Sequence, residues 1–137
     1  MSEALLPPEI LAKADLRHNE YAWRIADLPE VIAAARVLNL RNIGGQLQIR
    51  TPEAIGECDW VDIDACQLIP PVLPWDAQVE MSANIALQSL AELKAEVDFA
   101  AEIREAFPAP VGQYEASGGK LEDAIWFVWY VDAEDAA

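Results

Sequence analysis

The stretch from Asn42 to Asp64 constrains the fold most, because its pattern is that of a β-hairpin. Leu47 and Ile49 alternate with polar residues, and this period of two places apolar side chains on one face of a strand. Pro52 suits the second position of a tight turn, and a second partly apolar arm follows it. Since a two-stranded hairpin is only marginally stable alone, the rest of the chain has to cover one of its faces.

Two adjacent glycines, Gly44 and Gly45, stand at the start of the first arm. The pair lacks the lysine, the third glycine and the helix start of a phosphate-binding loop. Glycine inside a strand is typical of a bulge or of a place where another backbone comes close. The sequence therefore predicts one of these two features at the pair.

Three further segments have clear local signals. Ala124–Val131 is β-branched and aromatic on both faces, which predicts a strand in the middle of the sheet, beside the hairpin. In Asn19–Ile25 every second residue is aromatic or aliphatic, with Glu20, Ala22 and Arg24 between, which predicts another strand. Asp27–Leu38 is predicted to be a helix, with Asp27 and Glu30 placed as a capping box at its start.

A long amphipathic helix is predicted from Asp76 onwards. Apolar residues recur at spacings of three and four as far as Ala100, while the opposite face is charged. The residues Ser82–Asn84 favour caps over helix interiors, so a break is expected there. The helical region is expected to end before Pro108.

Prolines mark the segments between these elements. They predict a short helix at Pro7–Ala14, an extended connector at Gln67–Pro74 and a loop at Pro108–Lys120. Together the segments predict a single α+β domain over residues 1–137. Its mainly antiparallel sheet of about four strands would carry helices on one face, including the long amphipathic one.

The charge is distributed unevenly along the chain. The net charge is −15, and residues 51–137 contain three basic and eighteen acidic side chains, so the whole excess lies there. Such a field repels nucleic acids and anionic membranes and attracts basic proteins. No apolar run approaches the ~20 residues of a membrane helix, and the start of the chain lacks the pattern of a signal peptide. The prediction is a cytoplasmic protein.

Metal and nucleophilic chemistry have few candidate residues. Cys58, Cys66 and His18 are the only cysteines and the only histidine, which is too few for a zinc site of three or four such ligands. His18 lies in a polar connector, and no nucleophile elbow occurs. The sequence predicts no cofactor, and it favours a protein that is not an enzyme.

Carboxylates are densest at Asp59, Asp62 and Asp64. On a regular strand Asp62 and Asp64 would point to one side and Asp59 to the other. Two carboxylates on one face suit a cation or an acid and base pair, but no calcium-loop pattern accompanies them. A solvated strand end is the simpler interpretation.

The first functional hypothesis is a binding protein for a basic partner, of the kind that inhibitors and immunity proteins represent. Acidic residues around an aromatic anchor suit such a partner, because charge raises the association rate and the aromatic ring supplies affinity. The predicted contact residues are Asp59, Asp62, Asp64, Trp75, Asp76 and Glu80.

The second hypothesis is a small-molecule or enzymatic pocket. Gln46, Gln48 and Arg50 share one face of the first hairpin arm, and amides with a guanidinium suit a carboxylate or amide ligand. The competing interpretation is the solvated face of an antiparallel sheet. A homodimer through the long helix or the sheet edge is compatible with both hypotheses.

Overall fold

The computed structural model describes residues 2–135, which form one five-stranded antiparallel sheet and five α-helices. The sheet order is β1-β2-β5-β3-β4. The strands are β1 (Asp15–Arg17), β2 (Glu20–Trp23), β3 (Arg41–Arg50), β4 (Ile55–Asp64) and β5 (Ile125–Asp132). The predicted α+β fold is confirmed, and so is the central position of the last strand beside the hairpin.

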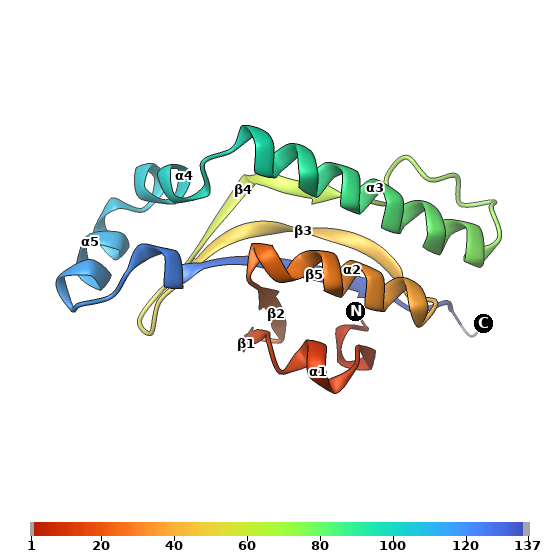
Figure 1. Cartoon of the computed structure of the whole chain (residues 1–137), viewed down its shortest axis with the longest axis horizontal. Coiled ribbons are helices and arrows are strands. Elements are labelled where there is room, and N and C mark those ends of the chain that lie inside the picture. Colours follow the sequence, from red (N-terminus) through yellow and green to blue (C-terminus); the bar gives the residue numbers. More distant parts are fainter. Residues whose placement is uncertain (1, 136–137) are drawn as a thin grey trace.

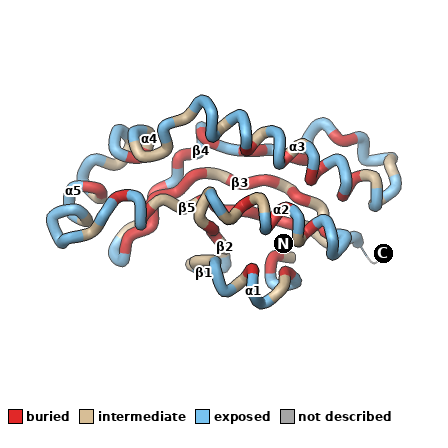
Figure 2. Tube along the Cα trace, viewed as in Figure 1, coloured by how far each residue is buried: buried red, intermediate tan, exposed pale blue. Residues whose placement is uncertain are grey.

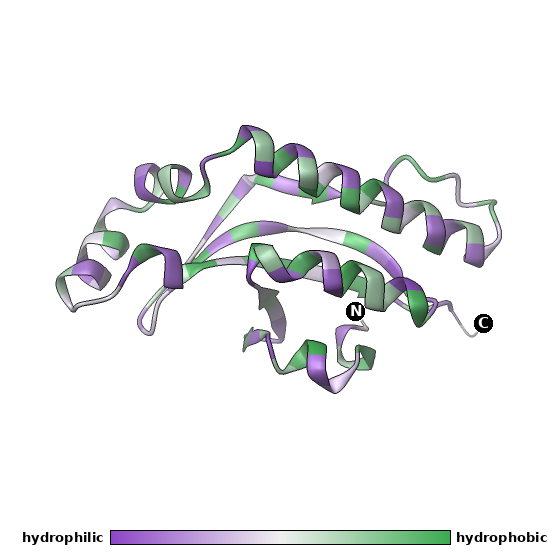
Figure 3. Ribbon diagram, viewed as in Figure 1, coloured by the Kyte–Doolittle hydropathy of each residue, from purple (hydrophilic) through white to green (hydrophobic). Residues whose placement is uncertain are grey.

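The long helix α3 (Trp75–Glu96) and helix α2 (Leu28–Val37) lie side by side on the same face of the sheet (Figure 1). The α-helices are α1 (Pro8–Leu11), α2 (Leu28–Val37), α3 (Trp75–Glu96), α4 (Phe99–Ala106) and α5 (Pro108–Ala116). Short 3-10 helices occupy Glu3–Leu5, Ile25–Asp27 and Leu121–Ala124. Hydrophobic and hydrophilic residues alternate around α3 (Figure 3), so one side of this helix can pack on the sheet while the other contacts water.

The core lies between this helical layer and the sheet, where the buried residues of both meet (Figure 2). From the sheet come Leu47, Ile49, Cys58, Phe127, Trp129 and Val131, all fully buried. From the helices come Val31, Ile32, Ala35, Ala83, Ala86 and Leu90. The alternation seen in the sequence therefore sends every second residue of β3 and β5 into one core.

The glycine pair sits where backbones come close, as predicted. Gly44 has a φ of +132°, and the pairing of β3 with β5 shifts register between Asn42 and Gly44. A Cβ atom on Gly45 would lie 1.6 Å from the carbonyl oxygen of Val128 on β5. Only glycine avoids both the strained φ and the overlap.

Two predictions about helix α2 and helix α3 need correction. Asp27 forms no capping hydrogen bond, because the 3-10 helix Ile25–Asp27 runs directly into α2 and gives Asp27 helical torsion angles. Helix α3 is continuous at Ser82, whose buried hydroxyl donates to the Val79 carbonyl and accepts from the Asn42 amide. The break comes later, where Asp98 caps α4 by accepting from the Ala101 amide.

Two predictions about proline-containing segments were also wrong. Residues 108–116 form helix α5, since proline is compatible with the first turn of a helix and Val111 packs into the core. The connector Gln67–Pro74 consists of turns rather than an extended segment on the core. Its Leu68 and Val72 side chains are each 89% exposed, and only Ile69 is buried.

The start of the chain closes the edge of β5 beyond its short pairing with β2. The Ser2 amide donates to the Val131 carbonyl, and the Glu3 carboxylate accepts from the Val131 amide at 3.0 Å. Glu3 is only 5% exposed, and this burial raises the pKa of its carboxyl group. The folded state therefore favours the protonated form, so the contribution of Glu3 to stability falls as the pH rises through its folded pKa.

Replacing Glu3 by alanine is expected to lower the free energy of unfolding by about 1–3 kcal/mol, since a buried amide loses its acceptor. Glu3→Gln keeps an acceptor but cannot ionise. Its stability relative to the wild type should therefore improve from pH 4 to pH 7 in urea titrations. An Ala variant as stable as the Gln variant would show that the contact with Val131 contributes nothing.

Candidate functional site

The sheet curls so that the face opposite the helices is concave. Strands β1 and β3 are separated by two other strands, which in a flat sheet would hold them about 14 Å apart. Yet Nη1 of Arg50, at the end of β3, donates to the carbonyl of Asp15 in β1 at 2.8 Å and to the Asp15 carboxylate at 3.1 Å. Arg17 also donates to the Thr51 carbonyl. These contacts fold the β1–β2 hairpin over the end of the β3–β4 hairpin.

This hairpin covers two of the polar residues that the sequence predicted for a ligand. Gln48 and Arg50 are 1% and 2% exposed. Arg50 donates through Nε to Gln48 and through both terminal nitrogens to β1 and β2, at Asp15 and at the Glu20 carbonyl. Its donors are thus directed at protein oxygens, and Arg50 joins two hairpins in place of binding a carboxylate ligand.

Gln46 and Gln48 hold the carboxylate of Glu57 in a fixed orientation. Both amide nitrogens donate to the same Glu57 oxygen, Oε1, at 2.9 and 2.8 Å. Gln46 also donates to the Tyr130 hydroxyl at 3.3 Å, and that hydroxyl donates to the carboxylate of Glu20. Burial, followed by the hydrogen bond to Glu20, raises the pKa of Tyr130 to about 12. The phenol therefore stays protonated and serves as a donor.

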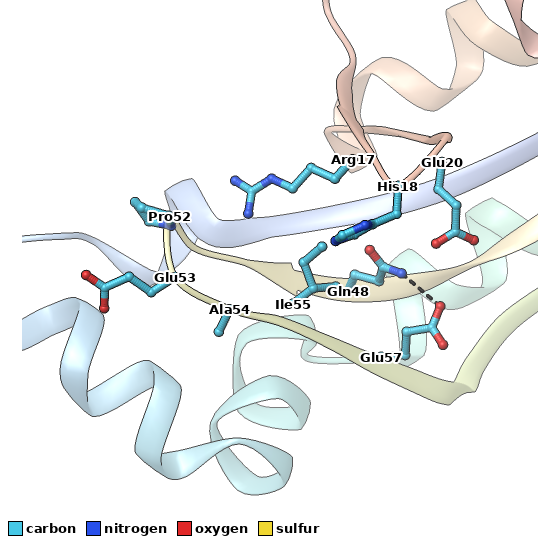
Figure 4. Close-up of a pocket in the computed structure, with 9 residues that line it drawn as sticks. All are labelled: Arg17, His18, Glu20, Gln48, Pro52, Glu53, Ala54, Ile55 and Glu57. Atoms are coloured by element: carbon cyan, nitrogen blue, oxygen red, sulfur yellow. Dashed lines mark hydrogen bonds between the residues drawn. The ribbon is translucent and has the colours of Figure 1, made fainter.

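A hollow with a volume of about 800 Å³ lies between the two hairpins. Its lining comprises Arg17, His18, Glu20, Gln48, Pro52, Glu53, Ala54, Ile55 and Glu57. Figure 4 shows the Glu20 and Glu57 carboxylates pointing into it from opposite sides. The turn residues His18 and Asn19 both have positive φ values, as a two-residue hairpin turn requires, and His18 is exposed at the hollow.

The three predicted aspartates lie together around a second hollow, which has a volume of about 350 Å³. Asp59, Asp62 and Asp64 line it with Gln46 and Tyr130, among other residues. Asp59 was expected on the opposite side, but β4 does not continue regularly. Residue 46 pairs with residue 62 while residue 47 pairs with residue 58, so three residues of β4 bulge out and reverse the alternation.

Four exposed carboxylates of β4 carry an uncompensated negative charge. Glu57, Asp59, Asp62 and Asp64 are all exposed, and none forms an ion pair within the part of the chain that the structure describes. The ion pairs of residues 2–135 use other carboxylates, such as Asp15 with Arg17 and Arg50. The concave face therefore carries, along an edge strand, a row of carboxylates without ion-pair partners in residues 2–135.

The other predicted contact residues lie in a different place, at the start of α3. Trp75 is half-buried and donates to the Asn39 carbonyl at 2.8 Å. Glu80 forms an ion pair with Arg36 at 3.1 Å, while Asp76 is exposed. The structure thus separates the six residues into three that share a hollow and three that stand at a helix start.

Residues that sequence reasoning missed complete the site. Glu20 and Tyr130 lie in strands that were predicted from their apolar residues, so the polar residues of these strands were not considered. Asp15 lies in a strand of only three residues, which was not predicted. The alternation in β5 is the signal that would have found Tyr130, because Phe127 and Trp129 face the core and Tyr130 must face away.

Residues 2–135 contain neither a cluster of metal ligands nor a membrane-spanning helix. Within that range no group of three or more His, Cys, Asp or Glu side chains is arranged to hold a metal ion. No helix in the same range is both long and apolar enough to cross a bilayer. Burial raises the pKa of Cys58 to about 11, so this thiol stays protonated and is a poor nucleophile.

The fold and the site together define an α+β protein with a curled antiparallel sheet and an acidic concave face. No protein-family model, curated protein or solved structure was found to match this chain. The residues and their geometry are therefore the basis for a functional proposal.

Proposed function

We propose that this protein is a non-enzymatic binding module that holds a basic segment of another protein on the concave face of its sheet. The observation that supports this most is the row formed by Glu57, Asp59, Asp62 and Asp64, exposed and without ion-pair partners in residues 2–135. Carboxylates in such a row attract Lys and Arg side chains, and long-range attraction increases the association rate.

The hydrogen bonds around Glu57 support the proposal further. Because two amides hold Oε1, the carboxylate has a fixed orientation and its other oxygen is available to a partner. A preoriented acceptor loses less entropy on binding than a free side chain. An inhibitor or immunity-type role is one form of this function, in which the carboxylates would occupy the positions that phosphates take on a nucleic-acid-handling partner.

The hollow of about 800 Å³ favours a second candidate, a small-molecule site contacted by Gln48. Its volume is within the range of ligand pockets. Arg50 is directed away from such a role by its contacts with β1 and β2. Of the three predicted ligand contacts, Gln48 lines this hollow, whereas Gln46 lines the second one. A thermal-shift screen with metabolites, repeated on Gln48→Ala, separates this candidate from the first.

The proposed function predicts salt-sensitive capture of a basic protein from native lysate. The wild type should retain such a protein at low salt and release it at high salt, because exposed charges are screened within about 10 Å at 0.1 M salt. A variant with Asp59→Asn, Asp62→Asn and Asp64→Asn, the trough triple variant, should not retain it.

The matched control carries Glu92→Gln, Glu96→Gln and Glu122→Gln, which changes the net charge equally at exposed sites outside the concave face. This control triple variant should capture the same protein as the wild type. Equal capture by all three proteins would contradict a role for the aspartates.

A further inference from the structure

The five tryptophans of the chain differ in what covers their rings. Trp23 and Trp129 are fully buried in the core, and each indole N–H has a partner. Trp23 donates to the Ile10 carbonyl at 2.8 Å, and Trp129 donates to the Asn42 side chain at 2.9 Å. These two rings serve the fold.

Two other tryptophans each have an arginine of the same chain over the ring. The Arg24 guanidinium carbon lies 3.7 Å from the Trp126 ring centroid, and that of Arg41 lies 5.0 Å from the Trp75 ring centroid. Both distances are within the range of cation–π attraction. Trp75, which the sequence suggested as an aromatic anchor for a partner, is therefore already occupied by a cation of its own chain.

Trp60 is the exception. Its side chain is 59% exposed, and no Lys or Arg of residues 2–135 is placed over its ring. The ring is nevertheless held in position, since its N–H donates to the Glu102 carboxylate of helix α4 at 3.0 Å. Trp60 stands in the middle of the β4 bulge, where the three unpaired residues lift it out of the regular strand.

The surroundings of Trp60 are acidic and hollowed. Trp60, Glu102, Glu105 and Ala106 line a depression of about 330 Å³. The negative charge also affects the neighbouring Cys58 thiol. Burial is the main cause that raises the pKa of this thiol, and the charges of Glu102 and Asp59 raise it further. A flat aromatic face beside carboxylates is the environment that a desolvated Lys or Arg side chain requires.

We propose that Trp60 is the aromatic anchor for the basic partner, and that a Lys or Arg side chain of that partner stacks on its ring beside Glu102 and Glu105. This inference rests on the proposed function and specifies its contacts. Asp59 and Asp62 flank Trp60 and face the concave side, so a basic segment crossing the edge of β4 contacts both the aspartates and the indole. Trp60, on the outer side of the bulge, thus has the anchoring role that the sequence analysis assigned to Trp75.

The test follows the five indole N–H resonances of the 15N-labelled protein during titration with a ten-residue peptide that alternates arginine and serine. Trp60→Phe assigns the Trp60 resonance. In the wild type this resonance should move on titration, while those of the buried Trp23 and Trp129 stay in place. Trp60→Leu should weaken binding about 2- to 30-fold, and Trp60→Phe should recover most of that loss because it keeps an aromatic face.

The trough triple variant separates the two proposals. Weak binding by that variant, together with unchanged binding by Trp60→Leu and a stationary Trp60 resonance, would overturn the anchor and leave the proposed function standing. A wild type that does not bind the peptide would overturn both. Glu102→Gln, which keeps an acceptor for the indole but removes the charge, should weaken binding less than Trp60→Leu and serves as a second variant.

Discussion

Replacing Gly45 by alanine is expected to destabilise the protein by more than about 4 kcal/mol, a large part of the 5–15 kcal/mol that holds a typical domain together. The new Cβ would lie 1.6 Å from the Val128 carbonyl oxygen and 2.6 Å from its carbon. Both atoms belong to the backbone of β5, which is paired with β2 on one side and β3 on the other. The strand has no free side toward which to move.

Gly112→Ala is the matched control for this prediction. Gly112 lies inside helix α5, and a Cβ there would meet nothing within 4 Å. Alanine should therefore stabilise the helix by about 0.5–1 kcal/mol. Urea unfolding followed by circular dichroism measures both variants. A Gly45→Ala protein that unfolds within 1 kcal/mol of the wild type would contradict the close packing of β3 against β5.

The elements that could be predicted from sequence have strong local patterns. The hairpin β3–β4 has alternating residues and a proline turn, and β5 has a run of aromatic and β-branched residues. Helix α2 has a clear apolar face, although its expected capping box does not form. Patterns of this kind depend only on residues that are close in sequence, so they can be recognised without knowledge of the fold.

The elements that were missed depend on tertiary contacts. Strand β1 is only three residues long, and it is stabilised by pairing with β2 and by the contact of Asp15 with Arg50. Helix α5 contains two prolines and a glycine, a composition typical of loops, yet Val111 anchors it in the core. No local pattern in either segment signals the partner that orders it.

The candidate site shows the same division. The clustering of Asp59, Asp62 and Asp64 follows from sequence, but their common direction depends on a three-residue bulge set by the register of β4 against β3. The covering of Gln48 and Arg50 depends on a hairpin about 30 residues earlier in the chain. The exposed Trp60 was overlooked because an aromatic residue in a strand usually packs inward.

The second large effect is expected for the trough triple variant, with Asp59→Asn, Asp62→Asn and Asp64→Asn. Each exposed ion pair with a basic peptide contributes about 0.2–1 kcal/mol, so the three together should account for a loss of about tenfold in affinity. The fold should be retained, because all three side chains are exposed. Thermal unfolding within a few degrees of the wild type checks this point.

The measurement that tests the central claim most directly is the dissociation constant of the arginine–serine peptide as a function of salt, for the wild type and the two triple variants. The wild type and the control triple variant should bind alike and lose affinity steeply from 20 to 300 mM salt. The trough triple variant should bind about tenfold more weakly at low salt, with a shallower dependence. Equal affinities and equal salt slopes for the two triple variants would show that total charge, and not the concave face, attracts the peptide.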